Sequence, residues 1–360
     1  MSITQNQILL YSVFFILSLS FSILINRLFL KFSKNLGMRN IDETMIRWES
    51  KSKPAFGGIS FYIIFLLSIS VYSIFSDDKT IFQKGQFLGL LLATSLGFIV
   101  GLADDAYNTK PYLKFSAQLI CGIILAASGT YIHLFSNNYL NYALTIIWVV
   151  GIMNSINMLD NMDAITSLVS VFIIISALYV ILALGKIDTV HFIILIGTLS
   201  SLIGFLFFNW HPSKIYMGDT GSQFLGVLLA AMGITYFWNT PFNEGFLAPS
   251  KQLILTAIIF IIPIVDTTTV VINRLAKGKS PFVGGRDHTT HHLSYMGLSD
   301  KQVALLLSGI ALLSLAMCVY IVQNVMWKTS NIIFFTLYFL LVFGLLYSTT
   351  LKNKPKEKSK

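Results

Sequence analysis

The sequence predicts an all-α, polytopic integral membrane protein that crosses the bilayer about eleven times. Only 11% of its 360 residues are charged and 55% are apolar, whereas a soluble domain carries about 25% charged residues. The apolar residues form runs of about 20, the length that spans a bilayer as a helix. These runs show no alternation of apolar and polar residues, which favours helices over the strands of a membrane barrel.

Eleven apolar runs are long enough to cross the membrane. The first run lacks the basic leader and small-residue cleavage site of a signal peptide, which favours an uncleaved helix. We expect one transmembrane domain over residues 1–350, followed by a basic tail over residues 351–360. The expected helices cover residues 8–30, 57–76, 86–103, 113–131, 140–158, 164–185, 190–208, 220–240, 251–273, 301–324 and 330–350.

The distribution of lysine and arginine predicts the orientation, because these residues stay on the cytoplasmic side during insertion. With the N-terminus outside and the C-terminus in the cytoplasm, 20 of the 25 Lys and Arg residues lie on the cytoplasmic side. The net charge of +9 therefore lies mainly at the inner leaflet, where anionic lipids attract it. It gives no indication of nucleic-acid binding.

Four inter-helix loops carry acidic and other polar residues beside membrane spans, where charges are costly and often mark function. In the predicted orientation all four loops lie on the cytoplasmic side, which indicates one shared site. The loops contain Asp104, Asp105 and Asn108; Asn154, Asn157, Asp160 and Asp163; Asp219; and Arg286, Asp287, His288 and His291.

The first two loops are typical of a site for a hard cation. Adjacent carboxylates such as Asp104 and Asp105 repel each other, so they need a cation or a raised pKa. Asn157 and Asp160 stand three residues apart and share one face of a helical turn. Oxygen ligands of this kind suit magnesium or manganese better than zinc. Helix-end capping by the same residues is the alternative.

The third loop is typical of a phosphate site. The segment Gly218–Ser222 opens a helix, whose free N–H groups attract phosphate, and Asp219 could hold a cation against it. A simple Asp or Thr cap is the alternative, because short glycine-rich strings are weak signals. Lys114 could neutralise a phosphate, or it could be an interfacial lysine.

The fourth loop carries His288, His291 and His292 without a zinc-ligand spacing, so phosphate or sugar contacts are expected; loop packing is the alternative. Asp266, inside the ninth run, either lines a polar cavity or bonds to nearby backbone. The two cysteines, Cys121 and Cys318, lie inside predicted spans and form no metal-ligand pattern.

Six motifs in order resemble the polyprenyl-phosphate N-acetylhexosamine-1-phosphate transferases, in their WecA-like bacterial branch. The resemblance runs from about residue 39 to residue 298. The FN…MGDTGS stretch is its most specific part. The motifs are KPAFGG (53–58), ADDAYN (103–108), NSINMLDNMDA (154–164), FNWHPSKIYMGDTGS (208–222), PIVDT (263–267) and GGRDHTTHH (284–292).

The chain departs from the family pattern at three positions. Asn161 and Ala164 replace the two glycines of the family's N-x-x-N-x-x-D-G-x-D-G motif. Thr290 takes the middle histidine position of the late His-x-His-His motif, so the role of that imidazole is not carried over.

The resemblance implies roles for the matching residues. Asn157 and Asp219 would be magnesium ligands, with manganese as a substitute. Asp104 and Asp105 would handle the acceptor phosphate, and Lys114 the pyrophosphate. Tyr216 would stack on uracil and Asn209 would hydrogen-bond it. Substrate binding would extend to Lys53, Asp160, Arg286, His288 and His291, with His288 close to the reacting groups.

The implied reaction moves N-acetylhexosamine-1-phosphate, by default GlcNAc-1-phosphate, from a UDP-sugar to undecaprenyl phosphate and releases UMP. The protein would be a cell-envelope or lipopolysaccharide enzyme of the bacterial cytoplasmic membrane, with its site on the cytoplasmic face, and a homodimer is plausible. Two alternatives stay open: a muramoyl-pentapeptide phosphotransferase and a non-enzymatic ion or solute transporter. Transporters bind near the midplane through repeats, whereas these acids cluster at one face and no repeat is visible.

Overall fold

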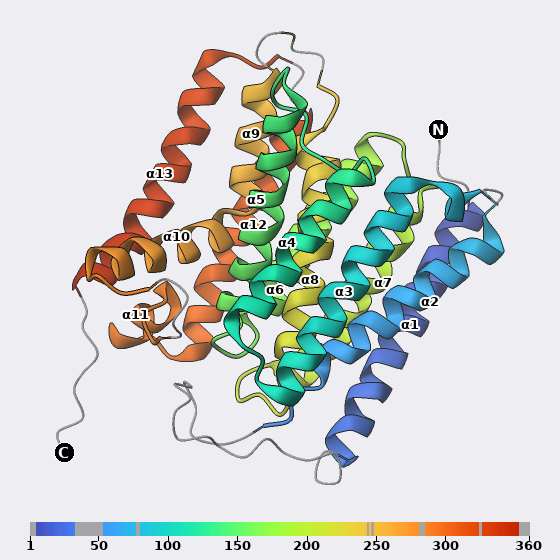
Figure 1. Cartoon of the computed structure of the whole chain (residues 1–360), viewed down its shortest axis with the longest axis horizontal. Helices are drawn as coiled ribbons and strands as arrows, with labels where there is room; N and C mark the ends of the chain where they lie inside the picture. Colours follow the sequence, from blue (N-terminus) through green and yellow to red (C-terminus); the bar gives the residue numbers. More distant parts are fainter. Residues whose placement is uncertain are drawn as a thin grey trace.

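The computed structural model describes residues 5–32, 53–76, 80–242, 245, 248–280, 285–323 and 326–352. Over these residues the chain is helical without a β-strand, which confirms the all-α prediction (Figure 1). Most of the predicted tail lies outside them. The helices are α1 (Gln5–Phe32), α2 (Gly57–Phe75), η1 (Ile81–Gln83), α3 (Gly85–Tyr107), α4 (Pro111–Ala127), α5 (Asn138–Leu159), α6 (Ile165–Ala183), α7 (Val190–Asn209), α8 (Gly218–Gly233), η2 (Ile234–Trp238), α9 (Ala248–Ile259), α10 (Ile261–Ala276), α11 (Thr289–Tyr295), α12 (Asp300–Gln323) and α13 (Thr329–Lys352).

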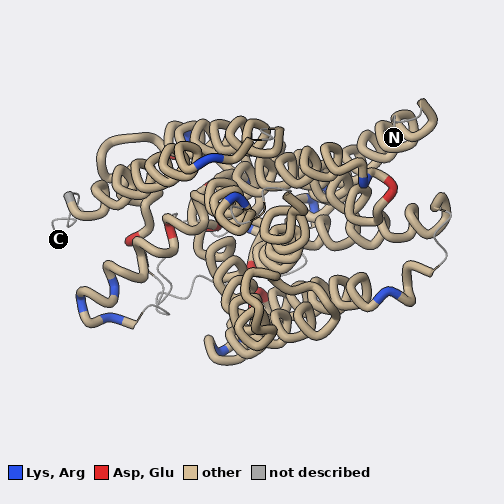
Figure 2. The backbone as a smooth tube through the Cα atoms, turned by 90° about the horizontal axis from the view of Figure 1, so that it is seen from above, with Lys and Arg blue, Asp and Glu red and all other residues tan. Residues whose placement is uncertain are grey.

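All eleven predicted apolar runs are helical, and the chain is a multi-pass membrane protein. Within the described ranges, nine helices are long and apolar enough to cross a membrane by themselves. The fourth run is α4, whose 17 residues extend about 25 Å. Figure 2 shows that charged residues occupy only scattered positions along the helical tube.

The ninth run, predicted as one span over 251–273, is instead a bent pair. Helices α9 and α10 meet at Phe260 with a bend of 78°, and α10 runs across the direction of α9 in Figure 1. Pro263 lies in the first turn of α10. It has no N–H to continue the hydrogen-bond ladder from α9, whereas the first turn of a new helix tolerates it.

Helix α8 lies at the centre of the bundle, packed against α2, α3, α5 and α6. Of the most apolar stretch in the span that α8 forms with η2 (Gly218–Trp238), 94% of the residues are buried inside the protein, compared with 17% for the peripheral α1. Two glycines allow the closest approaches to its start. A Cβ on Gly58 of α2 would lie 2.8 Å from the Thr220 carbonyl carbon, and one on Gly101 of α3 would lie 2.7 Å from the Thr220 Cα. Both distances are too short, so only glycine fits at either position.

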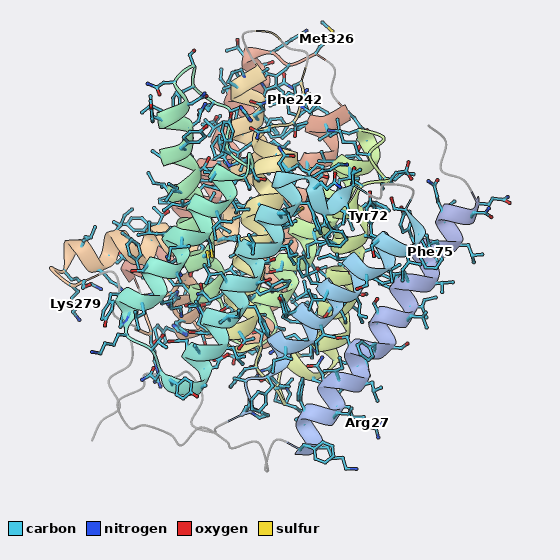
Figure 3. The ribbon with its side chains drawn as sticks, turned by 45° about the vertical axis from the view of Figure 1, so that its right-hand side comes forward. Arg27, Tyr72, Phe75, Phe242, Lys279 and Met326 are labelled. Atoms are coloured by element: carbon cyan, nitrogen blue, oxygen red, sulfur yellow. The ribbon has the colours of Figure 1, made fainter. Side chains whose placement is uncertain are left out.

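Successive helices alternate in direction, which separates the loops into two ends of the bundle. Arg27 of α1 lies near one end, and Tyr72 and Phe75 of α2 lie toward the other (Figure 3). The C-terminal ends of α1, α3, α5 and α7 share the end of Arg27 with the start of α8. The first three predicted polar loops therefore meet at one end, while the assignment of that end to the cytoplasm stays a prediction.

Candidate active site

Lys114 joins three of the predicted site residues at the start of α4. Its ammonium lies 3.2 Å from Asn157 Oδ1 and 3.6 Å from Asp104 Oδ2, and it pairs directly with Asp219 Oδ2. The three partners come from α3, α5 and α8. The lysine side chain is only 18% exposed, so water screens these charges weakly. Residues from three of the four loops that were predicted to share a site therefore lie together here.

Asp105 holds the first turn of α8. Its Oδ1 accepts a hydrogen bond from the Asp219 N–H (3.0 Å), and its Oδ2 accepts from the N–H and hydroxyl of Thr220 (2.9 and 2.7 Å). A carboxylate at a helix N-terminus satisfies free N–H groups and the helix dipole. Asp105 therefore caps the helix that carries Asp219.

Asp104 faces away from Asp105, although the two residues are adjacent. Its Oδ1 accepts from the N–H (3.0 Å) and the hydroxyl (2.5 Å) of Thr109, and its Oδ2 faces Lys114. Successive residues of an α-helix point about 100° apart, because a turn takes 3.6 residues. Asp104 is thus the member of the pair that lies beside the ammonium of Lys114.

Asn157 and a set of buried amides orient the Asp219 carboxylate. The Asn157 amide donates to Asp219 Oδ1 (2.8 Å) and to Ser222 Oγ (2.9 Å). One layer deeper, Gln118 donates to Gln223 and exchanges hydrogen bonds with Asn154 at 2.7 and 3.3 Å. These links tie α4 and α5 to α8 and hold the first layer in place.

Asp160 lies at the end of α5 among three other acids. Burial, and then the charges of Asp219, Asp105 and Asp163, raise the pKa of Asp160 well above its ordinary value. A cation or a hydrogen-bond donor from a substrate would relieve this repulsion.

Asp163 fixes the loop that follows α7. It accepts from the N–H (2.9 Å) and hydroxyl (2.6 Å) of Ser213 and from His211 Nδ1 (3.1 Å). The next residue, Ala164, has a φ of 65°, a region that costs a non-glycine residue about 1–2 kcal/mol. Ala164 thus keeps a backbone conformation that suits glycine, the residue that the family pattern has there.

The predicted base-binding residues lie on two paired segments. Tyr216 N–H donates to Pro54 O (2.9 Å), and Gly57 N–H donates to Tyr216 O (3.1 Å). The Lys53 ammonium lies 5.1 Å from the centre of the Tyr216 ring and donates to Ser213 Oγ (3.0 Å). The KPAFGG segment and the segment before α8 therefore form one unit, with Tyr216 beside the start of that helix.

Asn209, which the resemblance places on uracil, is buried in the structure. Its amide donates to Ile215 O (3.0 Å), and its Oδ1 accepts from Ala164 N–H (3.0 Å) and lies 3.4 Å from Ser167 Oγ. These bonds join the loop after α7 to the start of α6. Contact with uracil stays a prediction, and the structure shows Asn209 holding the loop between α7 and α8 against the start of α6.

His288 is held by a residue whose role the sequence left open. Asp266 of α10, 1% exposed, accepts from His288 Nδ1 (2.9 Å) and from the N–H (2.9 Å) and hydroxyl (2.5 Å) of Thr289. Bonding at Nδ1 orients the ring and leaves Nε2 as its second polar atom. The packing of α11 against α10 is what brings this loop to Asp266.

An ion pair with α10 also holds Asp287 of the fourth loop in place. Arg274 donates twice to Asp287, at 2.8 and 2.6 Å. Burial raises the pKa of Asp287, but these bonds lower it more, so the pKa lies below its ordinary value.

Burial, and then the charge of His288, lower the pKa of His291 to about 3, so its ring is neutral at pH 7. Arg286 is exposed.

A hydrogen bond joins the fourth loop to the second. Thr290 Oγ1 donates to Asn161 Oδ1 at 2.7 Å, while the Asn161 amide donates to Met158 O (2.8 Å). Asn161 and Thr290 are two of the three departures from the family pattern, and here they contact each other. The bond therefore links α11 to the loop after α5, which also carries Asp160.

The oxygen atoms around Lys114 suit a magnesium ion. Within the described residues no group of three or more His, Cys, Asp or Glu side chains has metal-binding geometry. However, carboxylate oxygens of Asp104 and Asp219 and the amide oxygen of Asn157 converge on one ammonium group. Hard divalent cations prefer such oxygens. The residues therefore fit a magnesium ion, with the ammonium of Lys114 as the positive charge already present.

Several supporting residues escaped the sequence reasoning. Thr220, Ser213 and Gln118 carry no charge, and nothing in their spacing indicates their partners, which are Asp105, Asp163 and the amides of Asn154 and Gln223. The Asp266–His288 pair escaped as well, because its residues stand 22 positions apart in the sequence and meet only where the start of α11 packs against α10.

A family model described as glycosyl transferase family 4 matches residues 87–237. The phospho-N-acetylmuramoyl-pentapeptide-transferase of Streptococcus agalactiae is 31% identical over 227 residues, covering 57% of this chain and 67% of that protein. The chain belongs to glycosyl transferase family 4.

Two other members of the family are similar over more of this chain. The probable undecaprenyl-phosphate N-acetylglucosaminyl 1-phosphate transferase of Bacillus subtilis is 27% identical over 300 residues, covering 81% of this chain and 79% of that protein. The decaprenyl-phosphate N-acetylglucosaminephosphotransferase of Mycobacterium leprae is 26% identical over 279 residues, covering 71% of this chain and 69% of that protein. Family membership makes this chain a membrane transferase, and the family model covers the segment from α3 to η2 that holds the Lys114 cluster.

Proposed function

We propose that the protein transfers N-acetylhexosamine-1-phosphate, by default GlcNAc-1-phosphate, from a UDP-sugar to undecaprenyl phosphate and releases UMP. The observation that carries this proposal is the convergence of Asp104, Asn157 and Asp219 on Lys114 at the capped start of α8. Two anionic phosphates must meet in such a reaction, so cationic groups must offset their repulsion. The Bacillus subtilis and Mycobacterium leprae relatives carry names of this reaction type.

In the proposed reaction an oxygen of the lipid phosphate attacks the β-phosphorus of the UDP-sugar. The bond from that phosphorus to the bridging oxygen breaks, and UMP leaves with the electron pair. Lys114 contacts the pyrophosphate, and Asp104 faces the acceptor phosphate. Magnesium, bound by Asp219 and Asn157, would supply further charge neutralisation.

The bonding of the two adjacent acids supports two different tasks for them. All three bonds of Asp105 go to α8, so we assign it to positioning Asp219. Asp104 has one oxygen directed at Lys114, so we assign it to the acceptor phosphate. A covalent intermediate on an aspartate is compatible with the sequence, and the bonding of Asp105 favours Asp104 as its site.

The donor would be bound by the paired segments and the fourth loop. Tyr216 would stack on uracil beside Lys53, and Asp160 would take hydrogen bonds from the donor. His288, Arg286 and His291 would contact the sugar or its phosphates. The neutral ring of His291 suits a hydrogen bond to a sugar hydroxyl better than a charge contact to phosphate.

The location of the site suits both substrates. The polar loops lie at one end of the bundle, where a lipid phosphate and a soluble nucleotide-sugar can meet. With the predicted orientation this end is the cytoplasmic face of a bacterial cytoplasmic membrane.

A donor panel tests the proposal. Purified protein in lipid nanodiscs with undecaprenyl phosphate and magnesium should release UMP from UDP-GlcNAc or UDP-GalNAc, and only when the lipid acceptor is present. A preference for UDP-MurNAc-pentapeptide would replace the proposal with the second candidate, which the 31% identity to the Streptococcus agalactiae protein favours. No UMP from any donor would overturn both.

Metal dependence gives a separate test of the cation site. Manganese should replace magnesium and zinc should not, because the candidate ligands are oxygen atoms. Asp219→Ala should abolish turnover, and thermal unfolding should show that the protein stays folded. Full activity in excess EDTA would rule out the metal assignment.

A further inference from the structure

An open cavity lies at the end of the bundle opposite the candidate active site. It has a volume of about 640 Å³ and is lined by the start of α1, the end of α2, the start of α3 and the loop before α7. In the predicted orientation this is the outer face. The proposed transferase reaction uses none of its residues.

Hydrogen bonds between elements build the walls of this cavity. The Tyr11 hydroxyl donates to Ile187 O (3.0 Å), and the Tyr72 hydroxyl donates to Asp188 O (3.1 Å). Gln7 Nε2 donates to Asp188 Oδ1 at 2.5 Å. Figure 3 shows Tyr72 and Phe75 on the side of α2 that lies near α1. These polar groups are therefore held in place by α1, α2 and the loop before α7.

Among the described residues, the lining carries one charge of each sign. Lys84 and Asp188 both line the cavity, and both side chains are exposed. Apolar side chains, among them Phe75 and Phe87, form other parts of its wall. A purely anionic ligand would meet the carboxylate, and a purely cationic one would meet the ammonium. The ligand that matches both charges is a zwitterion.

An apolar groove continues from this cavity along α1. A second cavity, of about 390 Å³, is lined by Tyr11, Ser12, Phe15, Ile16 and Ile196. Tyr11 lines both cavities, so the two adjoin. From Tyr11 to Ile16 the helix rises about 7.5 Å, away from the helix start and toward the middle of the bilayer. This is the direction that an acyl chain takes from its headgroup.

We propose that a zwitterionic phospholipid binds at this end of the bundle. Its ammonium group lies at Asp188, its phosphate lies near Lys84, and one acyl chain follows the groove beside Tyr11, Phe15 and Ile16. The lipid joins the peripheral α1, of which little is buried by protein, to α2, α3 and α7. This proposal does not depend on the transferase reaction, because no residue of the candidate active site takes part.

Native mass spectrometry of the purified full chain tests the proposal. The protein is exchanged into micelles that contain equal amounts of phosphatidylethanolamine and phosphatidylglycerol with the same acyl chains. Wild type should retain phosphatidylethanolamine in preference. Asp188→Asn and Lys84→Gln should each lower its retention by about tenfold, the effect of one lost charged hydrogen bond. Lys328→Gln, an exposed lysine at the same end of the bundle but outside both cavities, is the matched control and should retain the lipid.

Each outcome decides the proposal. Equal retention of both lipids, or unchanged retention in both cavity variants, would overturn it, as would an equal loss in Lys328→Gln. Retention of phosphatidylglycerol alone would show an anionic-lipid site instead. If Asp188→Asn fails to fold, because Gln7 loses its partner, Lys84→Gln still tests the phosphate contact, since the lysine side chain is exposed.

Discussion

Replacing Asp105 by asparagine tests whether this residue caps α8. The carboxylate accepts three hydrogen bonds, from the N–H groups of Asp219 and Thr220 and from the Thr220 hydroxyl. Asparagine keeps the shape but offers one oxygen, so its NH₂ group must face a backbone donor. It also removes the negative charge from the helix N-terminus.

The expected loss of stability follows from these contacts. A hydrogen bond to a charged group contributes about 1.5–3 kcal/mol, and a charge at a helix end contributes about 0.3–1 kcal/mol. With one bond lost and one weakened, Asp105→Asn should lower the free energy of unfolding by about 2–4 kcal/mol. The start of α8 would loosen, and Asp219 would move with it, so turnover should fall as well.

Asp104→Asn is the matched control. One asparagine oxygen still serves the two donors of Thr109, so we expect a loss of stability of at most about 1 kcal/mol. Turnover should nevertheless fall strongly, because the variant removes the charge beside Lys114. The adjacent acids should thus differ in stability while both matter for activity.

Thermal unfolding in one detergent and at one scan rate, together with initial rates of UMP release, measures both effects. The matched scan rate is necessary because membrane proteins often unfold irreversibly. Wild-type stability in Asp105→Asn, combined with lost turnover, would refute the capping role and return Asp105 to the acceptor phosphate. Equal destabilisation of both variants would refute the division of tasks.

Three further predictions follow from the structure. Tyr216→Ala should raise the KM for the UDP-sugar about tenfold or more and leave the KM for the lipid nearly unchanged, by analogy with base stacking worth about 1–3 kcal/mol; an unchanged donor KM would mean that the ring only packs. Asp266→Asn should destabilise α11 and weaken donor binding through misorientation of His288, visible as a higher donor KM and a lower unfolding temperature; wild-type values of both would show that the pair is dispensable. In a background that lacks both native cysteines, a cysteine at Tyr107 should resist an impermeant label in intact cells, whereas a cysteine at Tyr139 should react. The two side chains are 82% and 83% exposed and lie at opposite ends of the bundle. The reverse labelling pattern would invert the predicted orientation.

The amino-acid sequence by itself determined the membrane class and predicted the residues of the candidate site. Apolar runs near the thickness of a bilayer must form helices, because lipid leaves no other partner for backbone N–H and C=O groups. All eleven runs are helical for this reason. Charges are costly beside such helices, so Asp104, Lys114, Asn157 and Asp219 stood out, and the structure brings these four together.

Only the tertiary structure decided which partners each of these residues contacts. Asp104 and Asp105 are identical in type and adjacent in sequence, yet the helix turns one toward Lys114 and the other toward α8. The burial of Asn209 and the pairing of Asn161 with Thr290 depend in the same way on which elements pack together. So does the contact between Asp266 and His288, since it forms only where the start of α11 packs against α10. Periodicity and composition report the environment of a residue along its own helix, whereas its partners come from other helices that the sequence pattern does not place.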